Sequence, residues 1–140
     1  FRGVEYFAYG PYESYQDKHR ASRLGVYAQS VDAMHEDYIK PQEHGSHTGC
    51  TAVRLNGEDA ALWAASDAPF SFRVSHYPQE ALMAAAHDFE LERAPDVELC
   101  LDYKNSGIGS NSCGPVLDPR YALAEERFRF VLALGFAGLD

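Results

Sequence analysis

The chain has 140 residues, the length of a single domain, and 46% of them are hydrophobic and 13% aromatic, which is enough for a core and too many for a disordered chain. A net charge of −9 and an isoelectric point near 5.0 exclude nucleic acids and anionic membrane surfaces as expected partners, because both would repel the chain. No apolar run is long enough to cross a bilayer.

Short segments in which apolar and polar residues alternate are the dominant pattern, and such segments are typical of half-buried strands. The Asn56-Gly57 pair between two of them predicts a hairpin, because both residues tolerate a positive φ. The expected strands, in chain order, are residues 4–9, 24–30, 51–55, 60–64, 70–75, 97–103 and 128–132.

One segment has a different composition, since residues 78–86 are dense in helix formers. They begin with Pro78, whose missing N–H costs nothing at the first position of a helix. We therefore expect one short helix there. Many strands with a single helix indicate an all-β domain, built as a sandwich, over residues 1–140.

Three cysteines, an odd and sparse number, argue against a disulfide scaffold and favour a reducing cytoplasm. Cys100 lies in a strand-like run and is expected to be a small buried residue. The chain opens in another strand-like run instead of a polar tail, so we expect it to be a piece of a larger chain.

Three polar segments could carry chemistry. Residues 10–20 offer aromatic faces and carboxylates that suit sugars, and an ordinary surface loop is the plainer alternative. In residues 41–50, the spacing of His44, His47 and Cys50 resembles a zinc site, but no second ligand pair follows, so no metal is expected. Residues 105–115 are rich in glycine, serine and asparagine, and can bring backbone close to a ligand.

Four acidic residues could supply the paired carboxylates that cleave a glycosidic bond. The sequence does not give their separation, on which that mechanism depends. Taken alone, the residues indicate an all-β domain with two polar loops and leave its function open. The four residues are Glu13, Asp17, Glu43 and Asp102.

Four motifs, in the same order, resemble the C-terminal domain of the large β-galactosidases of glycoside hydrolase family two. Residues 10–17 (GPYESYQD) resemble the family's G-P-x-E-N-Y-x-D, and residues 38–45 (YIKPQEHG) resemble its Y-x-x-P-x-E-N-G. Residues 70–82 resemble F-x-F-x-x-S-x-Y-x-x-x-x-L, and residues 101–109 (LDYKNSGIG) resemble L-D-x-x-x-M-G-I/V-G. The resemblance spans nearly the whole chain.

This resemblance implies an all-β supersandwich related to the galactose mutarotase-like fold, with one short helix. It implies no catalytic residue here, because the family's two catalytic glutamates lie in a (β/α)₈ barrel too large for 140 residues. The implied function is that of a non-catalytic domain of a retaining β-galactosidase, which hydrolyses terminal β-D-galactosides such as lactose. The implied partners are the barrel and other domains of the parent enzyme, a galactoside substrate and further copies of a homo-oligomeric parent.

The resemblance also assigns a loop of the substrate pocket to Asn111, Ser112 and Cys113. Many relatives carry tryptophan at the position of Cys113, whose small side chain offers no face for stacking on a sugar. Magnesium and sodium are implied for the parent, with the main-chain carbonyls of Pro41 and Leu82 at a shared sodium site. No metal is implied for this chain alone.

Two alternatives stay open from the residues. A free-standing sugar-binding or aldose-epimerase-like domain would use Glu43 and His47 as an acid and base pair. A purely structural interaction module would use neither residue. A catalytic barrel in the same gene would decide for the β-galactosidase domain.

Overall fold

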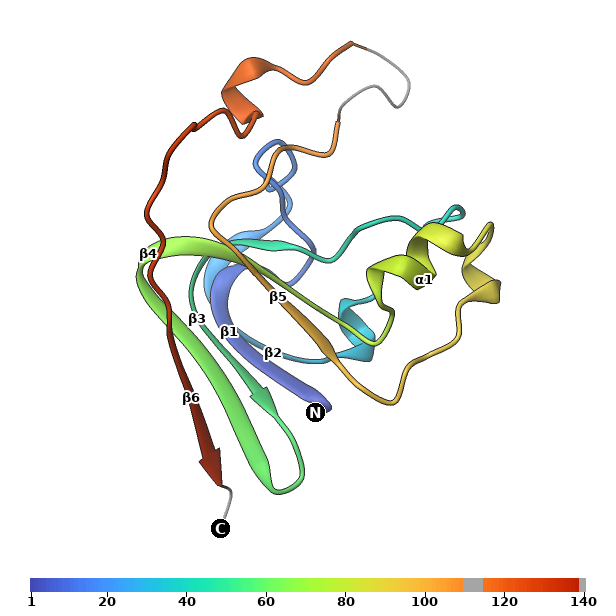
Figure 1. The fold of residues 1–140 in the computed structure, drawn as a ribbon, viewed down its shortest axis with the longest axis vertical. Coiled ribbons are helices and arrows are strands. Elements are labelled where there is room, and N and C mark those ends of the chain that lie inside the picture. The colour runs from blue at the N-terminus through green and yellow to red at the C-terminus, as the bar shows by residue number, and fades with distance from the viewer. Residues whose placement is uncertain (110–114, 139–140) are drawn as a thin grey trace.

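A computed structural model describes residues 1–109 and 115–138, in which six strands form one antiparallel sheet beside a single short α-helix (Figure 1). This confirms the prediction of a mostly β chain with one helix. The strands are β1 (Gly3–Gly10), β2 (Arg23–Ser30), β3 (His47–Asn56), β4 (Ala60–Ser75), β5 (Glu98–Asp102) and β6 (Ala133–Gly138). The helices are α1 (Gln79–Ala84) and the 3₁₀ turns η1 (Asp32–Met34), η2 (Asp88–Glu90) and η3 (Pro119–Tyr121).

Strand β4 is the longest strand and pairs with three others. The sheet order is β2-β1-β3-β4-β5, and β6 also pairs with β4. Residues Ala60 to Ala65 of β4 face β6, and Ser71 to Ser75 face β5. On its other side, Cys50 of β3 pairs with Phe70 and Ala52 pairs with Ala65, so residues 66–69 form a bulge.

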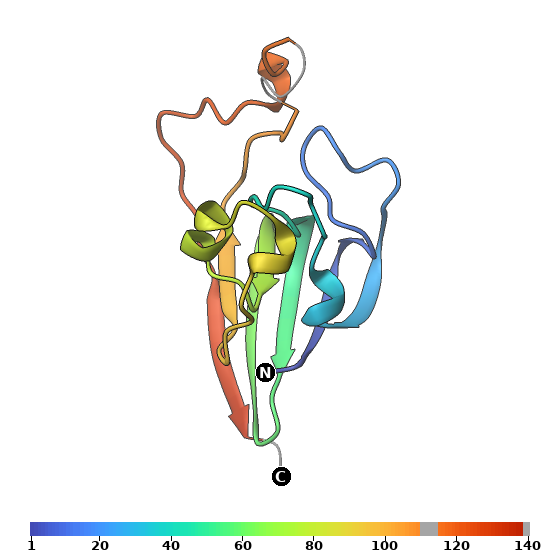
Figure 2. The ribbon, with the colours of Figure 1, turned by 90° about the vertical axis from the view of Figure 1, so that its right-hand side faces the viewer.

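The core lies on one face of the sheet, where alternate residues of β1, β3 and β4 point inward as the two-residue period requires. The helical connections, residues 31–46 and 76–97, lie over one face of the sheet (Figure 2). Val31 and Met34, from the first of these connections, join the core. The members from the strands are Val4, Tyr6, Ala8, Cys50, Val53, Leu55, Ala64, Phe70, Phe72 and Val74.

Two sequence predictions need correction. Residues 128–132 are not a strand, because β6 begins at Ala133 and its pairing ends opposite Ala65, where β4 enters its bulge. A cavity of about 410 Å³ separates the 128–132 segment from the bulge. The hairpin at Asn56 is confirmed, but Gly57 does not adopt a positive φ, and the loop before Ala60 has three residues.

The described strands all belong to one sheet and contain no second sandwich layer, so the supersandwich stays a prediction. The outer face of this sheet is exposed and partly apolar, with Phe7, Val26 and Trp63 on it. Among residues 1–109 and 115–138, no helix combines the length and the apolar character needed to span a lipid bilayer.

Candidate functional site

Three polar segments that are far apart in the sequence meet beyond one end of the sheet, away from the β3–β4 hairpin (Figure 1). They are residues 11–22, 41–46 and 103–109, and we call them together the loop cluster. Each contains part of a motif that carries the family resemblance. The sequence motifs therefore mark one place in the fold.

Glu13 is the buried centre of the loop cluster, with a side chain that is only 2% exposed. Its Oε2 accepts the Gly45 N–H at 2.8 Å, and its Oε1 accepts from Lys18 Nζ and the Tyr38 hydroxyl. Burial alone would raise the pKa of Glu13, but these hydrogen bonds outweigh it and lower the pKa below its ordinary value. Glu13 is therefore a charged structural anchor.

Gly45 is held in a conformation that suits glycine. Its φ is +75°, and a Cβ at this position would lie 2.9 Å from the Met34 carbonyl oxygen. This backbone turns the Gly45 N–H toward Glu13. Next to it, Ser14 N–H donates to the Ser46 carbonyl at 2.6 Å, which ties the first two segments together.

Asp17 fixes the base of the loop at residues 105–115. Its Oδ1 accepts the Ile108 N–H at 3.0 Å and its Oδ2 accepts the Gly109 N–H at 2.9 Å. A Cβ on Gly107 would lie 2.4 Å from Asp17 Cγ, so the contact requires glycine there. Asn105 adds a bond from its Nδ2 to Ser46 Oγ at 2.9 Å.

The predicted pocket residues Asn111, Ser112 and Cys113 lie outside the residues that the structure describes. The contact of these three residues with a bound sugar therefore stays a prediction. The structure shows how the chain leading to them is held, since Gly109 is the last described residue before them and is fixed by Asp17.

The histidine and cysteine spacing that resembles a zinc site does not gather into one group. His47 is buried, donates from Nδ1 to the Tyr9 carbonyl at 2.9 Å and stacks on Phe72. Burial lowers the pKa of His47, so it is a neutral core residue. Cys50 is buried, with a pKa raised to about 12 by that burial, and its Sγ contacts the Ala52 carbonyl.

The acid and base pair of the epimerase alternative is not formed either. Glu43 is exposed, while His47 lies in the aromatic core, and no hydrogen bond joins them among the described residues. The carboxylates of Glu13 and Asp17 are occupied by donors of the fold itself. Burial, and then the nearby charge of Glu43, raise the pKa of Asp102, so the carboxylates of Asp102 and Glu43 lie close enough to interact.

Pro41 and Leu82, the expected sodium ligands, are both buried. Lys40 Nζ donates to the Met83 carbonyl at 3.3 Å and to the Ala85 carbonyl, so an ammonium group already lies on the carbonyls beside Leu82. The carbonyls of Pro41 and Leu82 stay the predicted sodium ligands of the parent enzyme.

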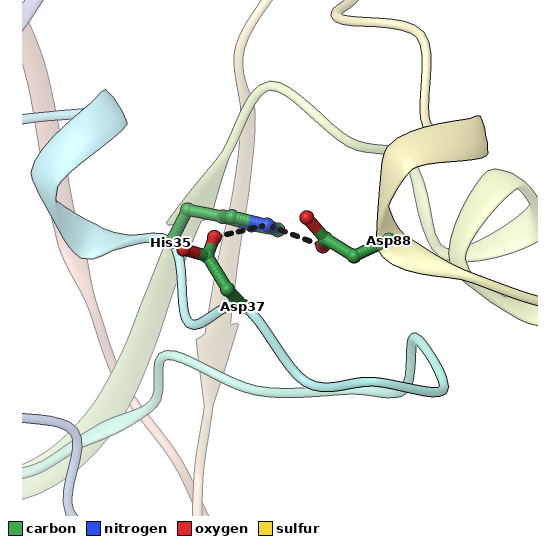
Figure 3. Close-up of side chains that lie close together, drawn as sticks. All are labelled: His35, Asp37 and Asp88. Atoms are coloured by element: carbon green, nitrogen blue, oxygen red, sulfur yellow. Dashed lines mark hydrogen bonds and ion pairs between the residues drawn. The ribbon is translucent and has the colours of Figure 1, made fainter.

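Sequence reasoning missed a second polar group, formed by His35, Asp37 and Asp88 (Figure 3). It is the one such cluster of potential metal ligands within residues 1–109 and 115–138. The His-x-Asp spacing of the first two residues was the only available signal, because Asp88 is 53 positions from His35.

Residues 1–134 match the family described as "Beta galactosidase small chain". The chain is 47% identical over 133 residues to a protein named "Beta-galactosidase" from Actinobacillus pleuropneumoniae, covering 95% of this chain and 13% of that protein. It is 39% identical over 136 residues to the "Beta-galactosidase" of Staphylococcus xylosus, covering 97% of this chain and 14% of that protein.

A third relative, the "Beta-galactosidase" of Kluyveromyces lactis, is 33% identical over 138 residues, covering 97% of this chain and 13% of that protein. The chain thus spans about an eighth of the length of these curated relatives. Because the family match covers nearly all of the described fold, the chain belongs to the β-galactosidase small chain family.

Proposed function

We propose that this chain is a non-catalytic domain of a retaining β-galactosidase and that it completes the substrate pocket with the loop at residues 105–115. The observation that carries the proposal is the pair of hydrogen bonds from Ile108 and Gly109 to Asp17. Two bonds to one carboxylate hold the backbone of Ile108 and Gly109 in place directly before the proposed pocket residues. A loop positioned by a rigid scaffold is the usual way in which a domain presents binding residues.

The proposed pocket role belongs to Asn111, Ser112 and Cys113, and the galactoside is the proposed ligand. The loop would act by positioning the sugar, while the catalytic glutamates belong to a barrel elsewhere in the complete enzyme. Magnesium and sodium in that enzyme stay predictions from the resemblance, as does its homo-oligomeric state. Within the described residues the thiols of Cys50 and Cys100 form no disulfide, which supports a reducing cytoplasm as its location.

The outer face of the sheet supports a proposed packing against other domains of the enzyme. Phe7, Val26 and Trp63 are exposed there around a groove of about 270 Å³. An exposed apolar sheet face is unfavourable in water and typically marks a surface that another layer covers. The second sheet of the expected supersandwich is the proposed cover.

The first expected result is that the 140-residue chain alone does not hydrolyse a chromogenic β-galactoside. The barrel that holds the paired carboxylates is predicted to lie outside this chain, and hydrolysis depends on that pair. The assay uses purified chain over a range of pH. Turnover that persists through purification and disappears in Glu43→Ala would contradict the prediction.

A chimera tests the positive part of the proposal. The matched segment of the Actinobacillus pleuropneumoniae protein is replaced by this chain, with which it shares 47% identity. In this chimera Asp17→Asn is expected to lower kcat/KM for a galactoside by about tenfold or more, because a small displacement of a substrate-positioning loop is costly. The asparagine NH₂ would face a backbone N–H where Asp17 now offers an acceptor.

The matched control is Asp59→Asn, an exposed residue in the β3–β4 hairpin at the opposite end of the sheet (Figure 1). We expect this variant to keep the kcat/KM of the unmodified chimera. Thermal melting of all three proteins checks that they are folded. Equal activity of the folded Asp17 and Asp59 variants would refute the role of the anchored loop.

A further inference from the structure

His35, Asp37 and Asp88 each place one potential ligand atom within 4.8 Å of the other two, and both carboxylates lie beside the His35 ring nitrogen (Figure 3). His35 Nε2 lies 3.0 Å from Asp88 Oδ1 and 3.4 Å from Asp37 Oδ1. The first two residues follow η1 in the β2–β3 connection, and Asp88 begins η2 in the β4–β5 connection. The cluster thus joins two long connections across one face of the sheet.

The hydrogen bonds behind His35 determine which of its ring nitrogens carries a proton. The Gln42 carbonyl can only accept, so His44 Nδ1, 2.8 Å away, must carry a hydrogen. In a neutral ring His44 Nε2 is then an acceptor, and its partner at 3.0 Å, His35 Nδ1, must be the donor. A neutral His35 consequently turns the lone pair of Nε2 toward two carboxylate oxygens, which are also acceptors.

In this tautomer three acceptors face one another, and a cation between them would bind all three. A proton on His35 Nε2 gives one positive charge and points along one hydrogen bond, which leaves one of the two carboxylates without a direct partner. A divalent metal ion accepts all three lone pairs and balances both carboxylate charges. The surrounding chain, with a net charge of −9, favours uptake of a cation as well.

We propose that His35, Asp37 and Asp88 form a binding site for a divalent transition-metal ion of the zinc type. Ligands bonded to zinc at about 2.0–2.2 Å in a tetrahedron are about 3.3–3.6 Å apart, which matches the 3.4 Å from His35 Nε2 to Asp37 and is slightly longer than the 3.0 Å to Asp88. One imidazole with two carboxylates is a borderline donor set that suits zinc better than magnesium. The side chain of Asp37 is 84% exposed, so a metal ion can reach the site from water.

His44 has the role of a positioning residue in this site. Metal-bound histidines usually donate their second ring N–H to a fixed acceptor, which sets the tautomer and the ring direction. Here the His35 Nδ1–H donates to His44 Nε2, and His44 donates in turn to the Gln42 carbonyl. The chain of bonds orients His35 Nε2 toward the two carboxylates.

A bound ion would cross-link the β2–β3 connection to the β4–β5 connection. Arg93 already links the same two connections, through its Nε at 3.0 Å from Asp32 Oδ1. A metal that binds only the folded chain stabilises it by mass action, so the melting temperature should rise with zinc concentration. The site therefore serves to hold the helical connections on the sheet.

The experiment titrates the metal-free 140-residue chain with Zn²⁺ by calorimetry, with Mg²⁺ as a second titrant. Visible absorption of Co²⁺ then reports the geometry. We expect one Zn²⁺ per chain, no heat from Mg²⁺ and a higher melting temperature with zinc. Asp37→Asn and Asp88→Asn should each weaken zinc binding by about tenfold or more, and His44→Gln by about ten- to a hundredfold.

Asp37→Asn is the decisive variant, because an exposed side chain can lose its charge without unfolding the chain. The matched control is His87→Gln, which removes an exposed histidine that lies 3.2 Å from the Glu90 carboxylate, and it should bind zinc like the unmodified chain. Unchanged zinc affinity in Asp37→Asn and Asp88→Asn would place the metal elsewhere and overturn the proposal. No zinc binding at millimolar concentration would mean that a proton holds the cluster, and would overturn it as well.

Discussion

Replacing Phe72 with alanine is expected to lower the free energy of unfolding by about 3–5 kcal/mol. Phe72 is 0% exposed in β4 and belongs to the core on the inner face of the sheet. Its ring meets Tyr6 edge to face with centroids 5.1 Å apart, and stacks on His47 at 5.2 Å. Alanine would lose the buried area and both aromatic contacts, and would leave a cavity that the sheet cannot close.

Urea unfolding followed by tryptophan fluorescence and circular dichroism measures this change, with the slope of the transition as a check on cooperativity. Phe89→Ala is the control, because Phe89 is 84% exposed in η2. It should change the free energy of unfolding by no more than about 0.5 kcal/mol. A similar small change for Phe72→Ala would contradict the core described for this fold.

The strands were predictable where one face is buried and the other polar. Residues 70–75 alternate between apolar and polar side chains, and β4 indeed points Phe70, Phe72 and Val74 into the core. In this stretch the opposite side is also buried, and Arg73 pairs there with Glu98. Alternation therefore predicted the strand and the face that packs into the core. It did not predict that the polar face is buried, because that burial depends on connections from elsewhere in the chain.

The elements that sequence reasoning missed lack this alternation. Strand β6 has the sequence ALGFAG, in which small residues and two glycines give no period, and it forms because β4 offers a free edge. Residues 66–69 contain Asp67 and Pro69 and read as a turn. In the structure these residues form a bulge within β4. The strands expected at residues 60–64 and 70–75 are therefore one continuous strand.

The site was predictable only in part. The family motifs singled out Glu13, Asp17 and Gly45, and the structure brings their segments together. Periodicity and spacing could not give the partners, since the bond from Ile108 to Asp17 spans 91 positions of sequence. The contact between His35 and Asp88 could not be predicted either, because the two residues are 53 positions apart and meet only when two connections fold over the sheet.

Replacing Glu13 with glutamine is expected to lower the free energy of unfolding by about 2–4 kcal/mol at neutral pH. The amide keeps the size of the side chain but loses the charge and places an NH₂ group among donors. Gly45 N–H, Tyr38 and Lys18 all now donate to the carboxylate. The loss stays below that of a fully buried ion pair, because the side chain of Lys18 is 51% exposed and water can solvate it.

The destabilisation caused by Glu13→Gln should depend on pH, and the lowered pKa of Glu13 determines whether it grows or shrinks in acid. Because the folded chain lowers this pKa below the ordinary value of 4.5, the charged carboxylate stabilises the fold fully above that value. The contribution is lost as the pH falls through the lowered pKa of the folded state. The difference in unfolding free energy between the unmodified chain and Glu13→Gln should therefore be constant near neutral pH and shrink in acid.

Urea unfolding of both proteins at a series of pH values measures this difference. Glu58→Gln is the matched control, since Glu58 pairs with Arg2 at 3.3 Å with both side chains largely exposed. Its effect should be at most about 1 kcal/mol, because surface ion pairs contribute little and are screened by salt. A Glu13→Gln effect as small as this control, or one that grows as the pH falls, would mean that the carboxylate does not hold the first two segments of the loop cluster together. Glu13 would then be a replaceable polar residue, and the order of the loop cluster would have to come from Ser14, Ser46 and the backbone alone.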